Sequence, residues 1–255
     1  MQTLLETALD SGVSHFDTAP LYGWGAAEPL LGELARRRRD EMTIVTKAGV
    51  APPSLAARAI AKLSRAPAHA RFNRFASDQV RRSLDASLRA LRTDRVEALL
   101  LHEIAPHQVS DELLGVLQNL KREGKAAAIG LATSADATSV LLREHPSLFD
   151  VVQLPYGAAT PAGVPIIVHS VLASNIDAMS NRLAQDAAAA RRFEDRTGVA
   201  AGDRRALGEL LLREALWRHA GGTVLFSSTR VETIRRNARL PPAISETPFT
   251  AELLA

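Results

Sequence analysis

The stretch that decides the fold is Phe16-Asp17-Thr18-Ala19-Pro20-Leu21-Tyr22-Gly23, in which a short apolar run ends at an acidic residue. The same pattern returns twice, with the next two apolar runs ending at Lys47 and His102. Short apolar runs separated by helical patterns are typical of parallel strands in an α/β barrel. Because the C-terminal ends of barrel strands converge on one mouth, we expect Asp17, Lys47 and His102 to lie together, with Tyr22 in the loop after the first strand.

These four side chains suit a site that donates a proton to a carbonyl oxygen. A free tyrosine has a pKa near ~10, and we expect the Lys47 ammonium to favour the phenolate and lower the pKa of Tyr22. Asp17 would keep the lysine charged and in place, and His102 would orient the substrate oxygen. The set would protonate that oxygen as a hydride reaches the carbonyl carbon.

Each of these residues also has a purely structural interpretation. An aspartate at a strand end commonly caps a helix or turn, Tyr-Gly is a common turn, and a histidine after an apolar run is commonly a core or surface residue. The joint order and spacing favour the site instead. Composition agrees, because the chain has only four lysines and only two tyrosines, Tyr22 and Tyr156.

Seven strand-like segments alternate with helical patterns, which predicts a parallel sheet. A length of 255 residues without a Pro/Gly/Ser linker favours one barrel domain over residues 1–255. The predicted strands are residues 13–17, 42–46, 96–101, 126–131, 150–154, 165–169 and 223–226, and the predicted helices are residues 2–11, 26–38, 78–92, 111–123, 135–144 and 203–219.

The chain resembles the aldo-keto reductases from about Leu4 to Arg239. Residues 16–23 are similar to the family's Asp-Thr-Ala-x-x-Tyr-Gly signature, residues 45–49 to its lysine strand, and residues 83–102 to its helix and histidine strand. The resemblance implies a TIM-barrel-like (β/α)8 fold. It also implies that the catalytic residues are Asp17, Tyr22, Lys47 and His102.

Two departures from the family pattern are visible. The chain begins inside the helix that follows the family's first strand, so we expect that strand to be missing and the sheet to have seven strands. The connection between the family's strands six and seven is only Pro155 to Val164, too short for the usual helix. Either the helix is reduced to a loop, or the strand predicted at 165–169 is wrong.

The resemblance also implies a nicotinamide cofactor, NADP(H), which would supply the hydride that no protein side chain can supply. Three residues stand at the family's carboxamide contacts, and two stand in the segment that stacks on the nicotinamide ring. The last strand passes through serines into a helix start, which offers free N–H groups to a phosphate. Two arginines there would bind the 2′-phosphate, and an asparagine would contact the adenine. In chain order, these cofactor-binding residues are Thr133, Ser134, Gln153, His169, Ser170, Ser227, Ser228, Arg230, Arg236 and Asn237.

Composition narrows the possible classes of protein further. No 18-residue apolar stretch is present, and the first residues do not form a secretory signal. The absence of cysteine excludes disulfides and thiol catalysis, and the remaining histidines lack metal-ligand spacing, so we assign no metal. These features fit a cytoplasmic enzyme.

The one basic run, Arg36 to Arg39, has two interpretations. It could contact nucleic acid, or it could be a solvated helix end where cations favour the negative pole of the dipole. We favour the helix end, because the net charge is only +3.

The leading hypothesis is an NADP-dependent carbonyl reductase or alcohol dehydrogenase for a small aldehyde, ketone or sugar-like substrate, with no nucleic-acid or membrane partner. The alternatives are a cofactor-binding regulatory or scaffold protein with little turnover, and a chain truncated by a misplaced start site. The edge beside the missing strand predicts self-association, or a loose protein that tightens with cofactor. Substrate choice would depend on Trp24, residues 48–75 and residues after His102.

Overall fold

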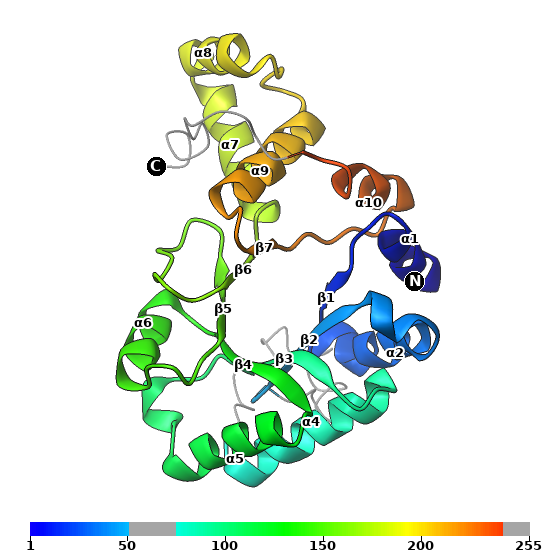
Figure 1. Ribbon diagram of the computed structural model, residues 1–255. Helices are drawn as coiled ribbons and strands as arrows, with labels where there is room; N and C mark the ends of the chain where they lie inside the picture. Colours follow the sequence, from blue (N-terminus) through cyan, green and yellow to red (C-terminus); the bar gives the residue numbers. More distant parts are fainter. Residues whose placement is uncertain (51–74, 242–255) are drawn as a thin grey trace, which may run out of the picture. The chain divides into compact units, whose positions relative to one another are not determined.

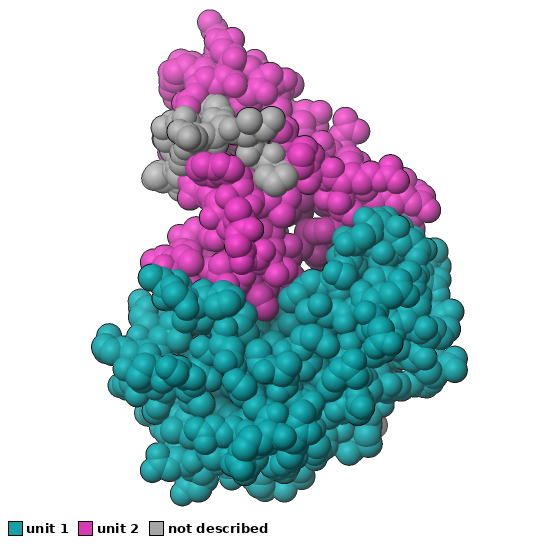
Figure 2. All heavy atoms as spheres, viewed as in Figure 1, with its two compact units in different colours: residues 1–153, 161–165 teal, residues 154–160, 166–255 magenta. Residues whose placement is uncertain are grey.

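The computed structural model describes residues 1–50 and 75–241, which fall into two compact units (Figure 2). The first contains residues 1–153 and 161–165, and the second contains residues 154–160 and the chain from Ile166 onward. The hydrogen-bonded order of the strands is their order in the sequence, β1 to β7. The seven strands predicted from the apolar runs are therefore confirmed among the described residues.

The first unit is a parallel α/β layer (Figure 1). Its helices α2, α4, α5 and α6 lie along one side of the strands, as the figure shows. Its strands are β1 (His15–Asp17), β2 (Thr43–Ala48), β3 (Val96–His102), β4 (Ala126–Ala132) and most of β5 (Val151–Pro155), and its α-helices are α1 (Gln2–Asp10), α2 (Ala27–Arg38), α4 (Ser77–Leu91), α5 (Asp111–Arg122) and α6 (Ala135–Glu144). Its described residues also form the short 3-10 turns η1 (Tyr22–Gly25), η2 (Arg39–Glu41) and η3 (Pro106–Gln108).

The helices form because each buries an apolar stripe against the strands or a neighbouring helix. In α4 the stripe is Val80, Leu84, Leu88 and Leu91, at the spacing of one helical face. Helix α2 packs unusually closely on α4, since a Cβ atom built at Gly32 would lie 2.3 Å from the Ala90 carbonyl oxygen. Any residue larger than glycine at that position would push the two helices apart.

The described part of the second unit, up to residue 241, contains two further strands and four helices. Strand β6 (Ile166–His169) pairs in parallel with β7 (Thr223–Val224), and the helices are α7 (Ala173–Gln185), α8 (Ala187–Thr197), α9 (Arg204–Arg218) and α10 (Val231–Asn237). Helices α7 and α8 were not predicted from the sequence. A local signal for α8 existed, because the Asp186 carboxylate caps it by accepting from the Ala188 and Ala189 N–H groups at 2.9 Å, and Gly198 ends it with a φ of 67°.

The short connection after β5 contains no helix in the described residues, so the family's helix is reduced to a loop. The strand predicted at 165–169 is confirmed as β6. The single-domain assignment, self-association and a cytoplasmic location stay predictions. Within residues 1–50 and 75–241, no helix combines the length and the apolar character needed to cross a bilayer.

Each arginine of the basic run at the end of α2 lies within 4.0 Å of a carboxylate, which favours the helix-end interpretation over a nucleic-acid surface. Arg36 pairs with Glu33, Arg37 with Glu6, Arg38 with Asp10 and Glu41, and Arg39 with Glu97. Each arginine faces a carboxylate of the chain itself, so the run does not present four free cations.

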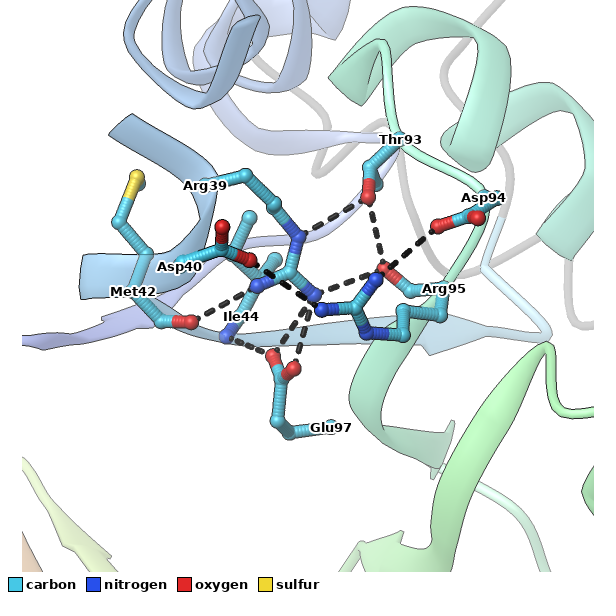
Figure 3. A network of polar contacts seen from close by, with 8 residues as sticks. All are labelled: Arg39, Asp40, Met42, Ile44, Thr93, Asp94, Arg95 and Glu97. Atoms are coloured by element: carbon cyan, nitrogen blue, oxygen red, sulfur yellow. Dashed lines mark hydrogen bonds and ion pairs between the residues drawn. The ribbon is translucent and has the colours of Figure 1, made fainter. Parts of the chain in front are cut away.

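Arg39 is the most buried of the four, and it ties together the beginnings of β2 and β3 (Figure 3). Its guanidinium donates to the Met42 carbonyl oxygen at 2.8 Å, to the Thr93 hydroxyl at 2.9 Å and to the Glu97 carboxylate at 2.8 Å. The same carboxylate accepts from the Ile44 N–H at 2.6 Å. The network therefore satisfies backbone groups where no strand ladder reaches them.

We expect Arg39→Met to lower the free energy of unfolding by about 1–3 kcal/mol, because it removes the cation paired with Glu97 and the donor to the Met42 carbonyl. The matched control is Arg36→Met, which removes an exposed arginine and should change stability by less than about 0.5 kcal/mol. Urea unfolding followed by circular dichroism measures both. Equal effects of the two substitutions would show that the network contributes no special stability.

Candidate active site

The strand register places four candidate side chains on one face of the sheet. Asp17 pairs with Val45, two residues before Lys47, and Val45 pairs with Ala98, four residues before His102. Further along the sheet, Gly130 of β4 pairs with Leu100 of β3 and with Val151 of β5, which lies two residues before Gln153. Because side chains alternate between faces along a strand, Asp17, Lys47, His102 and Gln153 point to the same side.

Lys47 is buried among these residues, with a side chain only 1% exposed. Its ammonium donates to Asp17 Oδ2 at 2.6 Å and to the Thr18 carbonyl oxygen at 3.1 Å. Burial lowers the pKa of Lys47, and the neighbouring Asp17 charge opposes that shift. The Gln153 amide donates to the other Asp17 oxygen, Oδ1, at 2.8 Å, so both oxygens of the carboxylate are held.

Tyr22 reaches this cluster from the turn η1 after β1. The Lys47 ammonium lies over its ring, 4.8 Å from the centroid. The His102 ring stands edge-on to it, with centroids 6.2 Å apart and planes at 89°. The structure therefore brings together the four residues that the sequence nominated.

The expected lowering of the Tyr22 pKa is not what this arrangement produces. Burial raises the pKa of Tyr22 above its usual value, and the charges of Asp17 and Glu103 raise it further. Because desolvation penalises the phenolate, it outweighs an ammonium that is already paired with Asp17. The phenol is therefore held in its neutral, proton-carrying form at ordinary pH.

Three residues were predicted to contact the carboxamide of the nicotinamide. Among the described contacts, only that of Gln153 joins the cluster. The Thr133 hydroxyl donates to the Ile104 carbonyl oxygen at 2.8 Å, and the Ser134 hydroxyl caps α6 by accepting from the Ala137 N–H at 3.2 Å. Both hydroxyls thus have local structural partners in this state. Their cofactor roles stay predictions.

The other cofactor candidates lie in the second unit. His169 Nδ1 and Ser170 Oγ are 2.8 Å apart, and the Ser228 hydroxyl accepts from the Arg230 N–H at 3.0 Å. Within this unit, a cavity of about 470 Å³ opens between α9 and α10. Its charged and polar lining consists of Arg204, Arg205, Glu209, Arg230, Glu232, Thr233, Arg236 and Asn237.

The cavity is lined by Arg230, Arg236 and Asn237, which were predicted to bind the cofactor. It is also lined by two arginines that were not predicted from the sequence. Arg204 and Arg205 begin α9 directly after its capping residue Asp203. The sequence alone gave little reason to predict a role for them, because two arginines at the start of a helix are usually solvent-exposed surface residues.

Two further polar residues were missed in the first unit. Glu28 and Thr46 are 5% and 0% exposed, and the Thr46 hydroxyl donates to Glu28 Oε1 at 2.6 Å. Thr46 directly precedes Lys47, and a polar residue inside an apolar strand was the available signal. In residues 1–50 and 75–241, no group of three or more acidic or histidine side chains is arranged to hold a metal ion.

Asp17→Asn tests the ion pair, because it leaves the buried Lys47 ammonium without a counter-charge. We expect the free energy of unfolding to fall by about 3–5 kcal/mol, and the double variant with Lys47→Met to recover part of that loss. The control is Asp10→Asn, which removes the exposed half of a surface pair and should cost at most about 1 kcal/mol. Urea unfolding compares the three. A loss no larger than that of the control would mean that the pair is not a buried one in solution.

Comparison with known proteins places these features in a family. The model of the aldo/keto reductase family matches residues 1–241. The chain is 32% identical over 135 residues to a 6-dehydroglucose reductase of Agrobacterium fabrum, covering 52% of this chain and 43% of that protein. It is also 32% identical over 152 residues to a D-threo-aldose 1-dehydrogenase of a Pseudomonas species, covering 55% and 46%. The match to these curated relatives therefore spans less than half of their length.

A solved structure agrees on the fold. The aldo-keto reductase of Klebsiella pneumoniae in complex with NADPH superposes with a TM-score of 0.64 at 20% identity, covering 96% of this chain and 86% of that one. At that identity the likeness concerns the fold alone. Together with the family match over nearly the whole chain, it leads to one conclusion: this chain belongs to the aldo/keto reductase family.

Proposed function

We propose that this protein is an NADPH-dependent oxidoreductase that interconverts a small carbonyl compound and its alcohol. The observation that carries the proposal is the buried Lys47–Asp17 pair placed against the Tyr22 ring, with His102 edge-on to the same ring. A neutral phenol, a paired ammonium and an imidazole on one face of a parallel sheet are the groups that carbonyl reduction needs.

In the proposed reaction, Tyr22 donates its phenolic proton to the substrate oxygen as that oxygen gains negative charge. The Lys47 ammonium, 4.8 Å from the ring centroid, stabilises the phenolate that is left behind. Asp17 holds the lysine, and His102 orients the carbonyl by hydrogen bonding. When bound, the nicotinamide supplies the hydride. Solvent then returns a proton to Tyr22.

The lining of the cavity between α9 and α10 fits the phosphate end of such a cofactor. It contains four arginines, and guanidinium groups bind phosphate oxygens in pairs of hydrogen bonds. Arg236 already pairs with Glu209 at 2.7 Å, so it would share its guanidinium between that carboxylate and a phosphate. Arg230 and Arg236 would bind the 2′-phosphate, and Asn237 would contact the adenine.

A sugar or a sugar-derived aldehyde is the substrate class with which we would begin. The two curated relatives compared above carry names of sugar oxidoreductases. Trp24 is 55% exposed two residues after Tyr22, and aromatic rings suit the apolar face of a sugar. Residues 51–74, part of the segment expected to shape substrate choice, lie outside the described residues.

Tyr22→Phe removes the donated proton and keeps the ring. We expect kcat for NADPH-dependent aldose or aldehyde reduction to fall by at least ~10²-fold, while NADPH affinity stays unchanged. Tyr156→Phe is the matched control, since that hydroxyl hydrogen bonds Glu214 at 3.2 Å in the second unit, and its activity should match the wild type. Activity is read from NADPH absorbance, and affinity from quenching of tryptophan fluorescence.

Two results would contradict this proposal. Near wild-type reduction by Tyr22→Phe would remove Tyr22 as the acid. Tight NADPH binding with no turnover of any aldose, aldehyde or ketone in a broad panel would favour the alternative of a cofactor-binding regulatory protein.

The double variant Arg230→Met and Arg236→Met tests cofactor choice. We expect it to weaken NADPH far more than NADH, by about 1.5–3 kcal/mol for each contact made, because only NADPH carries the 2′-phosphate. Arg235→Met is the control, because Arg235 lies on the same helix but does not line the 470 Å³ cavity. Fluorescence titration gives both dissociation constants. An equal loss for the two cofactors would show that these arginines do not bind the 2′-phosphate.

A further inference from the structure

We propose that the buried hydrogen bond between Thr46 and Glu28 is a clamp that positions the Tyr22 turn against Lys47, so that Glu28 and Thr46 are positioning residues for the acid. The inference rests on the proposed function and adds two residues to it. Neither side chain would touch the substrate.

The clamp lies on the opposite face of β2 from the candidate site. Thr46 and Lys47 are neighbours in the strand, so their side chains point to opposite faces. Lys47 points to Asp17 and Tyr22, while Thr46 points to Glu28 in the first turn of α2. A shift of Thr46 therefore moves the backbone that carries Lys47.

The same strand holds the Tyr22 turn at both ends. Before the turn, the Thr18 N–H donates to the Val45 carbonyl oxygen at 2.8 Å, and the Lys47 ammonium donates to the Thr18 carbonyl oxygen at 3.1 Å. After the turn, the Thr46 hydroxyl donates to Glu28 at 2.6 Å. The segment 19–27, which contains Tyr22, is therefore anchored at both of its ends to three consecutive residues of β2.

The turn between these points is strained and needs such support. Gly23, Trp24 and Gly25 have φ angles of 58°, 59° and 87°, and a left-handed conformation is costly for a bulky residue such as Trp24. Strained backbone of this kind persists only where its surroundings over-determine it. The backbone hydrogen bonds within the turn are short-range, with the N–H groups of Tyr22, Trp24 and Ala26 donating to the carbonyl oxygens of Ala19, Leu21 and Gly23.

Burial makes the clamp stiff. Water does not compete for a hydroxyl that is 0% exposed or for a carboxylate that is 5% exposed, so the contact is stronger than on the surface. Because a misplacement of about 1 Å at a reacting group can cost ~10²-fold in rate, small motions of the turn matter.

The experiment uses Thr46→Val, which keeps the side-chain shape and removes the donor. We expect kcat for NADPH-dependent reduction to fall roughly 10- to 100-fold with KM and NADPH affinity little changed, and Thr46→Ser to restore most of the rate. Thr138→Val is the matched control, because Thr138 is equally buried, at 1%, but lies on α6, and its kcat should equal that of the wild type.

A double-mutant cycle separates positioning from a general loss of structure. If the clamp acts through Tyr22, adding Thr46→Val to Tyr22→Phe should lower kcat no further. A further fall equal to that of Thr46→Val alone, or a failure of Thr46→Ser to restore the rate, would overturn the proposal.

A titration that needs no turnover distinguishes failure of the clamp from failure of the proposed function. In Tyr156→Phe, Tyr22 is the sole tyrosine, so phenolate absorbance reports its pKa alone. Burial raises that pKa, so we expect little phenolate absorbance near the ordinary pKa of ~10 and clearly more when Thr46→Val loosens the turn. The shift in a protein without reductase activity would support the clamp and contradict the function. An unshifted titration in an active protein would overturn the clamp alone.

Discussion

The buried ion pair between Lys47 and Asp17 is the interaction on which the rest of the first unit depends. An ammonium that is 1% exposed has lost its water, and only close partners make that state tolerable. Here the partners are a carboxylate at 2.6 Å and a carbonyl oxygen at 3.1 Å, while the Gln153 amide holds the second carboxylate oxygen at 2.8 Å. β1, β2 and β5 therefore meet through one buried charge pair.

The two ends of β2 and β3 carry different kinds of polar contact. At the beginnings of β2 and β3, Arg39 and Glu97 bind backbone groups and hold the strands together (Figure 3). At the other ends, Lys47 and His102 stand at the candidate site. This division is the one expected of barrel enzymes, in which stability resides at one end of the strands and chemistry at the other.

The environment of Tyr22 shows which electrostatic effect dominates in this arrangement. From the sequence, a lysine beside a phenol predicts a lowered pKa. In the folded chain the lysine is neutralised by Asp17 and lies over the ring face, while burial of the hydroxyl raises the pKa. An ammonium over the face of a neutral phenol is a favourable cation–π pair, so this arrangement favours the protonated phenol, which is the form that the proposed reaction requires.

The sequence by itself determined the seven strands, six of the helices and the shared face of Asp17, Lys47 and His102, because these follow from local periodicity and from spacing along parallel strands. Only the tertiary structure decided which distant groups pair. Gln153 meets Asp17 across 136 residues, Glu28 meets Thr46, and Arg39 meets Glu97. Periodicity predicts the face on which a side chain lies, but the partner and the degree of burial depend on how helices and strands pack. For that reason the sequence was enough to predict Tyr22 as a site residue, whereas the direction of its pKa shift depends on its burial in the folded chain.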